Sequence, residues 1–553
     1  MQGQNPRSKN QIPLRVFAVV VAVSLVLRMF VPSRLADPLE ILWLFLLCGA
    51  YLLTGCRGPR GLRVSFSWSC FLAAAAMTVS TFFSFVIASH MLSTPLRKAA
   101  ATLLVFCAYF LLFSSLAQRD LTSRFGPQER GQHLRPRTLL ALAALFSLIV
   151  LLPYRFYAPY GISGDTVSQW DQIHGLVPYN TIHAIGHTIF LKLLLSLWDN
   201  YAVVVLFHLL ALVCLYLVFA DFFYRRGLAL PYIALVLSLA LIWGFKATDA
   251  WYYPWKDTPA ALCLCIVTLL AAKYVDAGRL SVPAAALLGF ALAWCFLFRL
   301  NGIIALVVCG AVFLVSFARR RHFRQLTAAL LAMAVSIGGI SLYAQTALHP
   351  ERYQNGFALQ LFGSAIAAVV HEDDLSADEL QEIDQLLPVD WMQDLYVDAR
   401  QKRPLLWEQD DSPAIAANPD LSILNNDFVI RMGENKAGVI RLFLRLLPTH
   451  FPTMARDILG SMAIIWMQET LFFITNHIFW LVTIVFLAFR KRLPLREWLV
   501  FLPCACNAFS IMISTATNEI RYLLPTFMAA PFFVMYLVWR AGPDRLDHTE
   551  PSP

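Results

Sequence analysis

Charged residues are scarce in this sequence, and long apolar runs are abundant. Only 14% of the 553 residues are Asp, Glu, Lys or Arg, and 58% are hydrophobic, whereas a soluble domain carries roughly 25% charged residues. This scarcity excludes an ordinary soluble protein. Repeated apolar runs of about 18 residues or more predict an all-α, polytopic integral membrane protein that crosses the cell membrane many times.

Cysteine is missing from the long polar region, and no cysteine pattern indicates a metal site. The 11 cysteines lie almost all in apolar segments, which argues against a disulfide framework. The pairs Cys263/Cys265 and Cys504/Cys506 are spaced by two, so their side chains lie on different faces of a helix and are better explained by packing. The N-terminus also lacks a small-residue cleavage site, so we interpret its apolar run as an uncleaved span.

The apolar runs predict about fourteen membrane helices. The net charge of +9 is explained by Lys and Arg in cytoplasmic loops, not by nucleic-acid binding, and both termini are expected in the cytoplasm. The spans run roughly 13–31, 37–55, 66–90, 98–117, 138–153, 200–222, 229–248, 257–274, 282–298, 302–318, 325–346, 456–489, 496–517 and 522–539.

The segment 182–198 allows two interpretations. Counted as a span, it would place Arg225 and Arg226 outside the cell. Counted as a half-helix or interfacial helix, it lets 200–222 cross inward and places both arginines inside. We favour the second interpretation, which makes the stretch after residue 153 and the polar region 347–455 extracytoplasmic.

The spans and loops divide the chain into five parts, and no internal repeat is apparent. They are N-terminal accessory membrane helices (1–137), a membrane core (138–346) with a catalytic outer loop at 154–187, an extracytoplasmic helical lid (347–455), C-terminal membrane helices (456–540) and a disordered tail (541–553). In the lid, Ser376 and Glu379 fit a capping box at a helix start. A second stretch predicts an interfacial helix or a surface for anionic lipid; it carries Arg431, Lys436, Arg441 and Arg445 beside Val439, Ile440 and Leu444.

The outer loop contains the densest group of polar residues in the core. Such groups are expensive at membrane depth, so we expect them at a wet face or in a water-filled cavity. If 165–175 is helical, Asp165, Gln169 and Gln172 share one face, which we expect to point toward water. A helix cap would explain Asp165 equally well.

Two histidines in this loop are candidate ligands. His183 and His187 are four residues apart, so they share a face if the segment is helical. With the carboxylate of Asp165, this spacing can bind a divalent metal. Neutral histidines that bind a sugar or a lipid head group explain the pattern as well.

Three further motifs place charge at helix ends. Lys256 and Asp257 follow the aromatic run 251–255, which by itself indicates a membrane-interface belt with Asp257 as a cap. The second motif, residues 299–302, lies between the spans 282–298 and 302–318. The third, residues 518–522, lies between the last two spans. The residues of interest there are Arg299 and Asn301 in the second motif, and Glu519, Arg521 and Tyr522 in the third.

The predicted topology brings four of these charged residues to the outer face. Asp165, Lys256, Arg299 and Arg521 come from loops far apart in the sequence. The positive-inside bias disfavours Lys and Arg at the outer face, so their presence there indicates a function. Binding of an anionic phosphate is such a function, since Lys and Arg bind phosphate well and Arg can do so bidentately.

These motifs resemble those of the polytopic GT-C glycosyltransferases that use lipid-phosphate-linked sugars, in a bacterial, uncharacterised branch. The resemblance covers roughly residues 138–540. It is carried by Gly164-Asp165-Thr166 with Gln169, by Tyr179-Asn180-Thr181-Ile182-His183, by Trp255-Lys256-Asp257, by Arg299-Leu300-Asn301-Gly302 and by Glu519-Ile520-Arg521-Tyr522.

The resemblance implies transfer of a sugar from a polyprenyl-phosphate donor to a glycan, lipid or protein acceptor of the cell envelope, on the extracytoplasmic face. Asp165 would be the general base, or would help to bind a metal. The donor phosphate would be held by Lys256, Arg299 and Arg521, and substrate by Gln169, His183, His187, Asp257, Asn301, Glu519 and Tyr522.

Two departures from the family pattern stand out. Four spans precede the catalytic loop where many members have one. Asp165 is followed by Thr166 and Val167, so the loop has no Asp-x-Asp. Dependence on Mg²⁺ or Mn²⁺ through Asp165, His183 and His187 therefore stays open.

Two other classes of protein fit part of the pattern. A polysaccharide polymerase or ligase shares the lipid-phosphate substrate but depends less on one loop carboxylate. A lipid or sugar transporter (flippase) predicts inverted repeats and a site at the membrane midplane, whereas the charges here collect at one face.

Overall fold

The computed structural model describes residues 68–81, 131–181, 183–247, 250–351, 359–387, 426–461, 477–490, 493–514 and 520–540, with single residues between 95 and 110 and at 356, 389 and 392. These residues form helices joined by turns, with one isolated parallel bridge between Asn180 and Glu351. The prediction of an all-α chain is confirmed for this part of the protein. The predicted spans 13–31 and 37–55 and the tail 541–553 lie outside the described residues.

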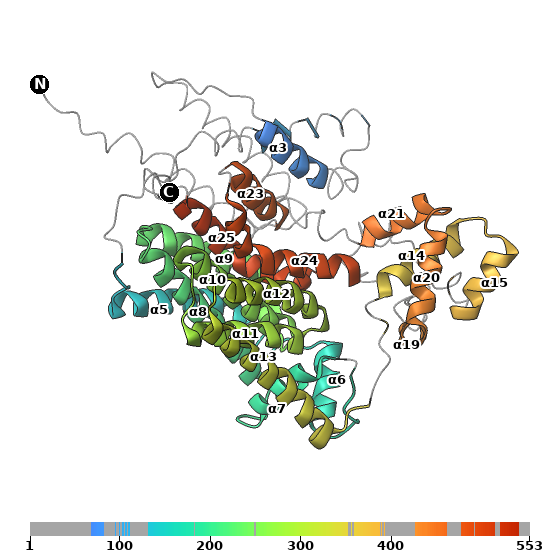
Figure 1. Cartoon of the computed structure of the whole chain (residues 1–553), viewed down its shortest axis with the longest axis horizontal. Coiled ribbons are helices and arrows are strands. Elements are labelled where there is room, and N and C mark those ends of the chain that lie inside the picture. The colour runs from blue at the N-terminus through green and yellow to red at the C-terminus, as the bar shows by residue number, and fades with distance from the viewer. Residues whose placement is uncertain are drawn as a thin grey trace, which may run out of the picture. The chain divides into compact units, whose positions relative to one another are not determined.

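The chain divides into two units, and Figure 1 labels the helices of both. One comprises 1–126, 466–492 and 540–553, and the other 127–465 and 493–539. In the first, α3 (Trp68–Thr81) packs against α23 (His477–Arg490). Residues 456–540, which the sequence predicts to be one part, therefore contribute to both units.

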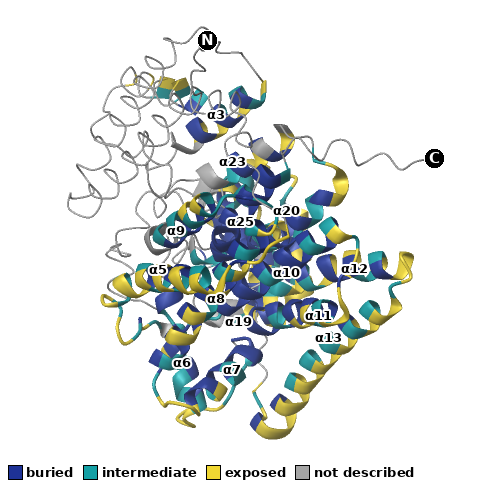
Figure 2. Ribbon diagram, turned by 90° about the vertical axis from the view of Figure 1, so that its left-hand side faces the viewer, coloured by how far each residue is buried: buried dark blue, intermediate teal, exposed yellow. Residues whose placement is uncertain are grey.

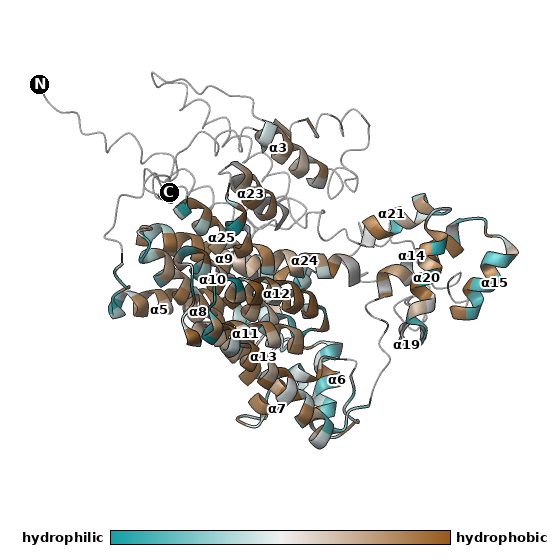
Figure 3. Ribbon diagram, in the orientation of Figure 1, coloured by the Kyte–Doolittle hydropathy of each residue, from teal (hydrophilic) through white to brown (hydrophobic). Residues whose placement is uncertain are grey.

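Long apolar helices form the main body of the second unit (Figure 3). Six helical segments among the described residues are long and apolar enough to cross a membrane: Pro136–Tyr154, Ala202–Tyr224, Asp257–Ala277, Leu300–Arg319, Phe323–Leu348 and Arg521–Arg540. The membrane character of the chain is supported by these segments. The helices of this body are α5 (Pro136–Tyr154), α8 (Ala202–Tyr224), α9 (Leu230–Ala247), α10 (Asp257–Ala277), α11 (Val282–Phe298), α12 (Ile303–Arg319), α13 (Phe323–Tyr343), α24 (Leu502–Ser514) and α25 (Leu524–Arg540).

Local sequence signals set the limits of the central helices. Pro259 lies in the first turn of α10, where its missing N–H is not needed, and Gly278 ends the helix with a positive φ of 71°. The side chain of Ser281 accepts a hydrogen bond from the backbone N–H of Ala284 at the start of α11. Short helical turns connect or extend the long helices: η2 (Ala250–Tyr252), η3 (Leu300–Gly302), the π-helical η4 (Ala344–Leu348), η6 (Leu495–Val500) and η7 (Ile520–Leu523).

Burial distinguishes inner from outer helices (Figure 2). Most of α10 and α25 is buried, whereas α13 and α5 are largely exposed and present apolar side chains such as Leu331, Val335 and Leu148. Helices with exposed apolar faces are those expected to meet lipid.

The contact between α11 and α13 depends on a glycine. A Cβ atom at Gly289 would lie 2.1 Å from the backbone oxygen of Ala329. Small residues let membrane helices approach closely and pack without a hydrophobic driving force. Gly289 therefore permits the tight packing of these two helices.

Two short helices lie beside this body and carry the predicted outer loop. They are α6 (Gly164–Ile173) and α7 (Ile185–Leu195). With 11 residues, α7 is about 16 Å long, roughly half of the ~30 Å hydrocarbon core. Its length agrees with the half-helix interpretation of 182–198.

The polar region forms a helical lobe with its own core. Buried side chains such as Ile366, Ile383 and Val439 pack together there. Of the apolar side chains predicted for an interfacial helix, Val439 is instead buried in this core, while Ile440 and Leu444 are exposed. The lobe contains α14 (Gln360–Glu372), α15 (Ala377–Leu386), α19 (Asn426–Glu434), α20 (Lys436–Leu446) and α21 (Phe451–Ser461).

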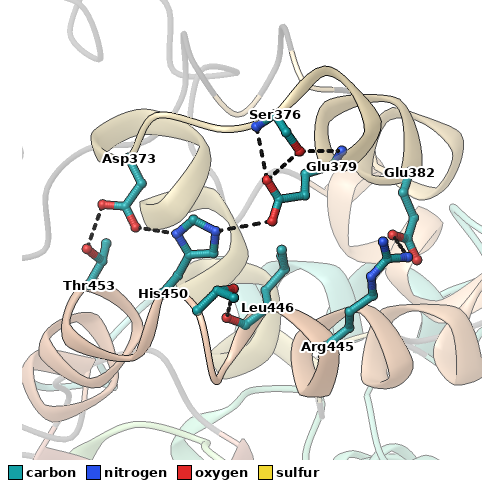
Figure 4. A network of polar contacts seen from close by, with 9 residues as sticks. Asp373, Ser376, Glu379, Glu382, Arg445, Leu446, His450 and Thr453 are labelled. Atoms are coloured by element: carbon teal, nitrogen blue, oxygen red, sulfur yellow. Dashed lines mark hydrogen bonds and ion pairs between the residues drawn. The ribbon is translucent and has the colours of Figure 1, made fainter.

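The predicted capping box is confirmed at the start of α15. The Ser376 hydroxyl accepts from the Glu379 backbone N–H, and the Glu379 carboxylate accepts from the Ser376 N–H at 2.9 Å. Figure 4 shows that the same carboxylate faces the ring of His450, whose Nδ1 lies 2.7 Å from Asp373. This network joins the loop before α15 to the turn between α20 and α21.

Candidate functional site

The start of α6 positions the carboxylate of Asp165. Ser163 is the N-cap: its hydroxyl accepts from the Thr166 backbone N–H and lies 2.7 Å from the Thr166 hydroxyl. Asp165, in the first helical turn, is therefore not needed as the cap, and its side chain is available for other contacts. The alternative that Asp165 caps this helix is wrong.

Lys256 joins Asp165 to His183. It is the N-cap residue of α10, and its Nζ lies 3.1 Å from Asp165 Oδ2 and 3.2 Å from His183 Nδ1. An ammonium group carries three donors and no acceptor, so Lys256 donates to both partners. The outer loop and the start of α10, which are far apart in the sequence, thus meet at one cation.

The surroundings set the charge of Asp165. Burial alone would raise the pKa of this carboxyl, but the charges of Lys256, His183 and Arg521 and the hydrogen bond from Lys256 lower the pKa to about 2. Asp165 is therefore ionised at neutral pH.

The same surroundings keep the ring of His183 uncharged. Burial, followed by the neighbouring charge of Lys256, lowers the pKa of His183 to about 4, so the ring is neutral at pH 7. Since Nδ1 accepts from Lys256, the remaining ring proton is on Nε2.

Arg521 completes the positive side of this group. Its guanidinium carbon lies 4.4 Å from the centroid of the Trp255 ring, close enough for a cation–π contact. The Trp255 indole N–H donates to the Ser163 hydroxyl at 2.6 Å. Trp255 thus connects Arg521 to the cap of the helix that carries Asp165.

Arg299 lies nearby but is already paired. Its guanidinium lies 2.6 Å from the carboxylate of Asp257, and both side chains are buried. The guanidinium also lies 4.7 Å from the Tyr522 ring, which Arg521 approaches at 5.3 Å. The structure therefore brings Arg299 to the site, but with its charge balanced by Asp257. Asn301 lies half-buried in η3, two residues after Arg299.

The polar face of α6 points inward, so the expectation that it faces water is wrong. Gln169 and Gln172 are buried, while Val167 is exposed. The Gln169 amide donates to the Thr188 hydroxyl and accepts from His187 Nδ1, both at 3.0 Å. Buried amides need such partners, and α7 supplies them.

The aromatic run before Lys256 is not a membrane-interface belt throughout. Trp251 and Tyr252 are fully buried, and the Tyr252 hydroxyl donates to the backbone oxygen of Val150. Tyr253 stacks on Trp255 with ring centroids 4.2 Å apart. These rings hold the turn that presents Lys256.

The three predicted metal ligands contact other side chains in the structure. His183 precedes α7 while His187 lies within it, and His187 binds Gln169. Asp165 and His183 both contact Lys256, whose positive charge repels a divalent ion. Among the described residues, no group of three His, Cys, Asp or Glu side chains is placed to hold a metal.

Several of the predicted residues therefore lie together in the structure, and further residues that the sequence did not single out lie beside them. Glu519 lies outside the described residues. The sequence reasoning missed Ser163, Thr188 and the positioning of Trp255. For Ser163 a signal was present, because a serine shortly before a polar helix is a typical N-cap.

No protein-family model, curated protein or solved structure matches this chain. One ionised carboxylate, one neutral imidazole and two adjacent cations can accept a proton from a hydroxyl and hold an anionic group.

Proposed function

We propose that this protein is a membrane glycosyltransferase that moves a sugar from a polyprenyl-phosphate donor to an acceptor of the cell envelope. The observation that carries the proposal is the group of Asp165, His183, Lys256 and Arg521, which come from four separate segments. The GT-C-like fold and the extracytoplasmic position are part of the same proposal.

The site lies at helix ends, which favours a substrate held near a membrane surface. Asp165 is in the first turn of α6, Lys256 is the N-cap of α10, and Arg521 lies in η7 just before α25. A transporter would place its charges at mid-helix, around broken spans. A phosphate on a lipid chain can reach helix ends while its tail remains among apolar helices.

The transfer requires one proton acceptor and one anion site. The acceptor hydroxyl gives its proton to Asp165 as its oxygen bonds to the anomeric carbon of the donor sugar. The bond from that carbon to the phosphate oxygen breaks, and its electron pair leaves with the phosphate. Lys256 and Arg521 offset the charge that develops on this leaving group.

Lys256 also controls the basicity of Asp165. In the free protein Lys256, together with His183 and Arg521, lowers the pKa of Asp165 to about 2, which makes the carboxylate a weak base. A donor phosphate that shares this ammonium weakens its hydrogen bond to Asp165 and so raises the basicity of the carboxylate. Donor binding thereby activates the base.

The test is sugar transfer by Asp165→Asn in membranes supplied with a polyprenyl-phosphate sugar. We expect transfer to fall roughly 100-fold or more, because the amide cannot accept the acceptor proton. Asp171→Asn is the matched control, since Asp171 lies on the same helix but outside the Lys256 contacts, and it should retain transfer. Equal turnover by Asp165→Asn and the wild type would remove Asp165 from the mechanism.

A further inference from the structure

We infer that the ammonium of Lys256 takes the place that a divalent metal ion would occupy between Asp165 and His183, so that the site works without a metal. The two atoms that Lys256 contacts, a carboxylate oxygen at 3.1 Å and an imidazole nitrogen at 3.2 Å, are typical metal-binding atoms. Here both are bound by a cation that belongs to the chain itself.

The neighbouring groups support this assignment. Arg521 is close enough to Asp165 and His183 to affect the ionisation of both. A divalent ion added beside Lys256 and Arg521 would face two positive charges at short range. Among the described residues, the carboxylate of Asp257 is already paired with Arg299 at 2.6 Å.

The number of donors on Lys256 connects this inference to the substrate. Two of its three N–H groups are used by Asp165 and His183. The Lys256 side chain is 22% exposed, so the third N–H can bind an oxygen of the donor phosphate. This last step rests on the proposed function, whereas the replacement of a metal does not.

The test of metal replacement is Mn²⁺ binding to the purified full-length protein in lipid nanodiscs, measured by electron paramagnetic resonance. We expect no Mn²⁺ site in the wild type that Asp165→Asn removes. Lys256→Ala should create such a site, because it exposes the carboxylate and the imidazole. This variant should bind Mn²⁺ at least about tenfold more tightly than the wild type does. The double variant Lys256→Ala/Asp165→Asn should lose it again.

The control variant is Lys192→Ala, which removes a half-buried lysine that contacts Tyr179 and should create no Mn²⁺ site. Size-exclusion profiles and thermal unfolding establish whether each variant is folded. If Lys256→Ala is not folded, Lys256→Met, which keeps most of the aliphatic stem, replaces it in the Mn²⁺ measurement. An Asp165-dependent Mn²⁺ site in the wild type would overturn the inference. So would a folded Lys256→Ala or Lys256→Met protein that binds no Mn²⁺ through Asp165.

A second measurement separates this inference from the proposed function. Binding of polyprenyl phosphate to the wild type should be the same within about twofold with EDTA or with Mn²⁺, and should weaken at least about tenfold in Lys256→Met. Loss of wild-type binding in EDTA would contradict metal independence. Failure to bind polyprenyl phosphate under either condition would contradict the proposed function, while the Mn²⁺ result alone would still decide the role of Lys256.

Discussion

At the scale of single residues, the ammonium of Lys256 stabilises the charge states of its neighbours. It stabilises the ionised carboxylate of Asp165 and, together with burial, disfavours protonation of His183. One cation thus lies about 3 Å from both an ionised acid and a neutral imidazole. These two groups can then serve different purposes, proton acceptance by Asp165 and hydrogen-bond donation by His183.

The lowered pKa of His183 predicts a dependence of stability on pH. The unfolded state takes up a proton near pH 6.5, whereas the folded state does so only at about pH 4. Stability from this residue is therefore complete above pH 6.5 and is lost as the pH falls toward 4, by up to about 3 kcal/mol. His183→Gln should remove this part of the decline in thermal stability between pH 6.5 and 4.

The control for this measurement is His174→Gln. The pKa of His174 is raised, chiefly by its hydrogen bond to the Trp170 backbone oxygen and further by Asp199. Its contribution has the opposite sign: it is present at low pH and is lost as the pH rises through the folded-state pKa. An identical effect of the two substitutions would contradict the assigned state of His183.

At the scale of secondary-structure elements, the packing of α11 on α13 depends on Gly289. Gly289→Ala would place a Cβ atom 2.1 Å from the Ala329 backbone oxygen, and backbone cannot move aside cheaply. We expect a loss of about 1–3 kcal/mol in stability, measured as a lower unfolding temperature of the purified protein.

Gly310→Ala on α12 provides the comparison, because a Cβ atom there meets nothing within 4 Å. This change should leave stability unchanged or raise it by up to about 1 kcal/mol, since alanine favours the helix. Equal destabilisation by both substitutions would show that the α11–α13 contact does not cause the loss of stability in Gly289→Ala.

The same scale shows what the sequence could and could not predict. Hydrophobic runs located the core helices α8 to α13 within a few residues, because a span must be long and apolar. The capping box at Ser376 and Glu379 was also predicted, because it depends on local spacing alone. The count of about fourteen spans stays a prediction, since six described segments meet the requirements of a span.

Tertiary partners explain the predictions that failed. The polar face of α6 was expected to meet water because its sequence could not show that Thr188 and His187 satisfy Gln169. The buried positions of Trp251 and Tyr252 likewise depend on neighbouring helices. The convergence of Lys256 with Asp165 was inferred only through the predicted topology, whereas its bond to His183 required coordinates.

At the scale of the whole molecule, the proposal requires the outer loop and the α11–α12 turn to face the same side of the membrane. Three exposed positions test this: Leu176 in the loop, Leu300 beside Arg299, and Phe323 at the start of α13, after the turn that follows α12. We expect Leu176→Cys and Leu300→Cys to react with an impermeant thiol reagent on intact cells.

Phe323→Cys should react only after permeabilisation, and the wild type, whose native cysteines are present throughout, gives the background. The positive-inside bias of the arginines near Phe323 is the physical reason for the expected orientation. Reaction of Leu176→Cys and Leu300→Cys from opposite sides would mean that the proposed topology is wrong.

The measurement that tests the central claim most directly is binding of polyprenyl phosphate to the full-length protein in nanodiscs, compared between the wild type and Arg521→Met. Arg521 should supply charge-assisted hydrogen bonds to the phosphate, so its loss should weaken binding by roughly 10- to 100-fold. Arg320→Met, at the end of α12 where Arg320 binds the Gly278 backbone oxygen, should bind like the wild type. Equal affinity of Arg521→Met and the wild type would contradict a phosphate site at Lys256 and Arg521.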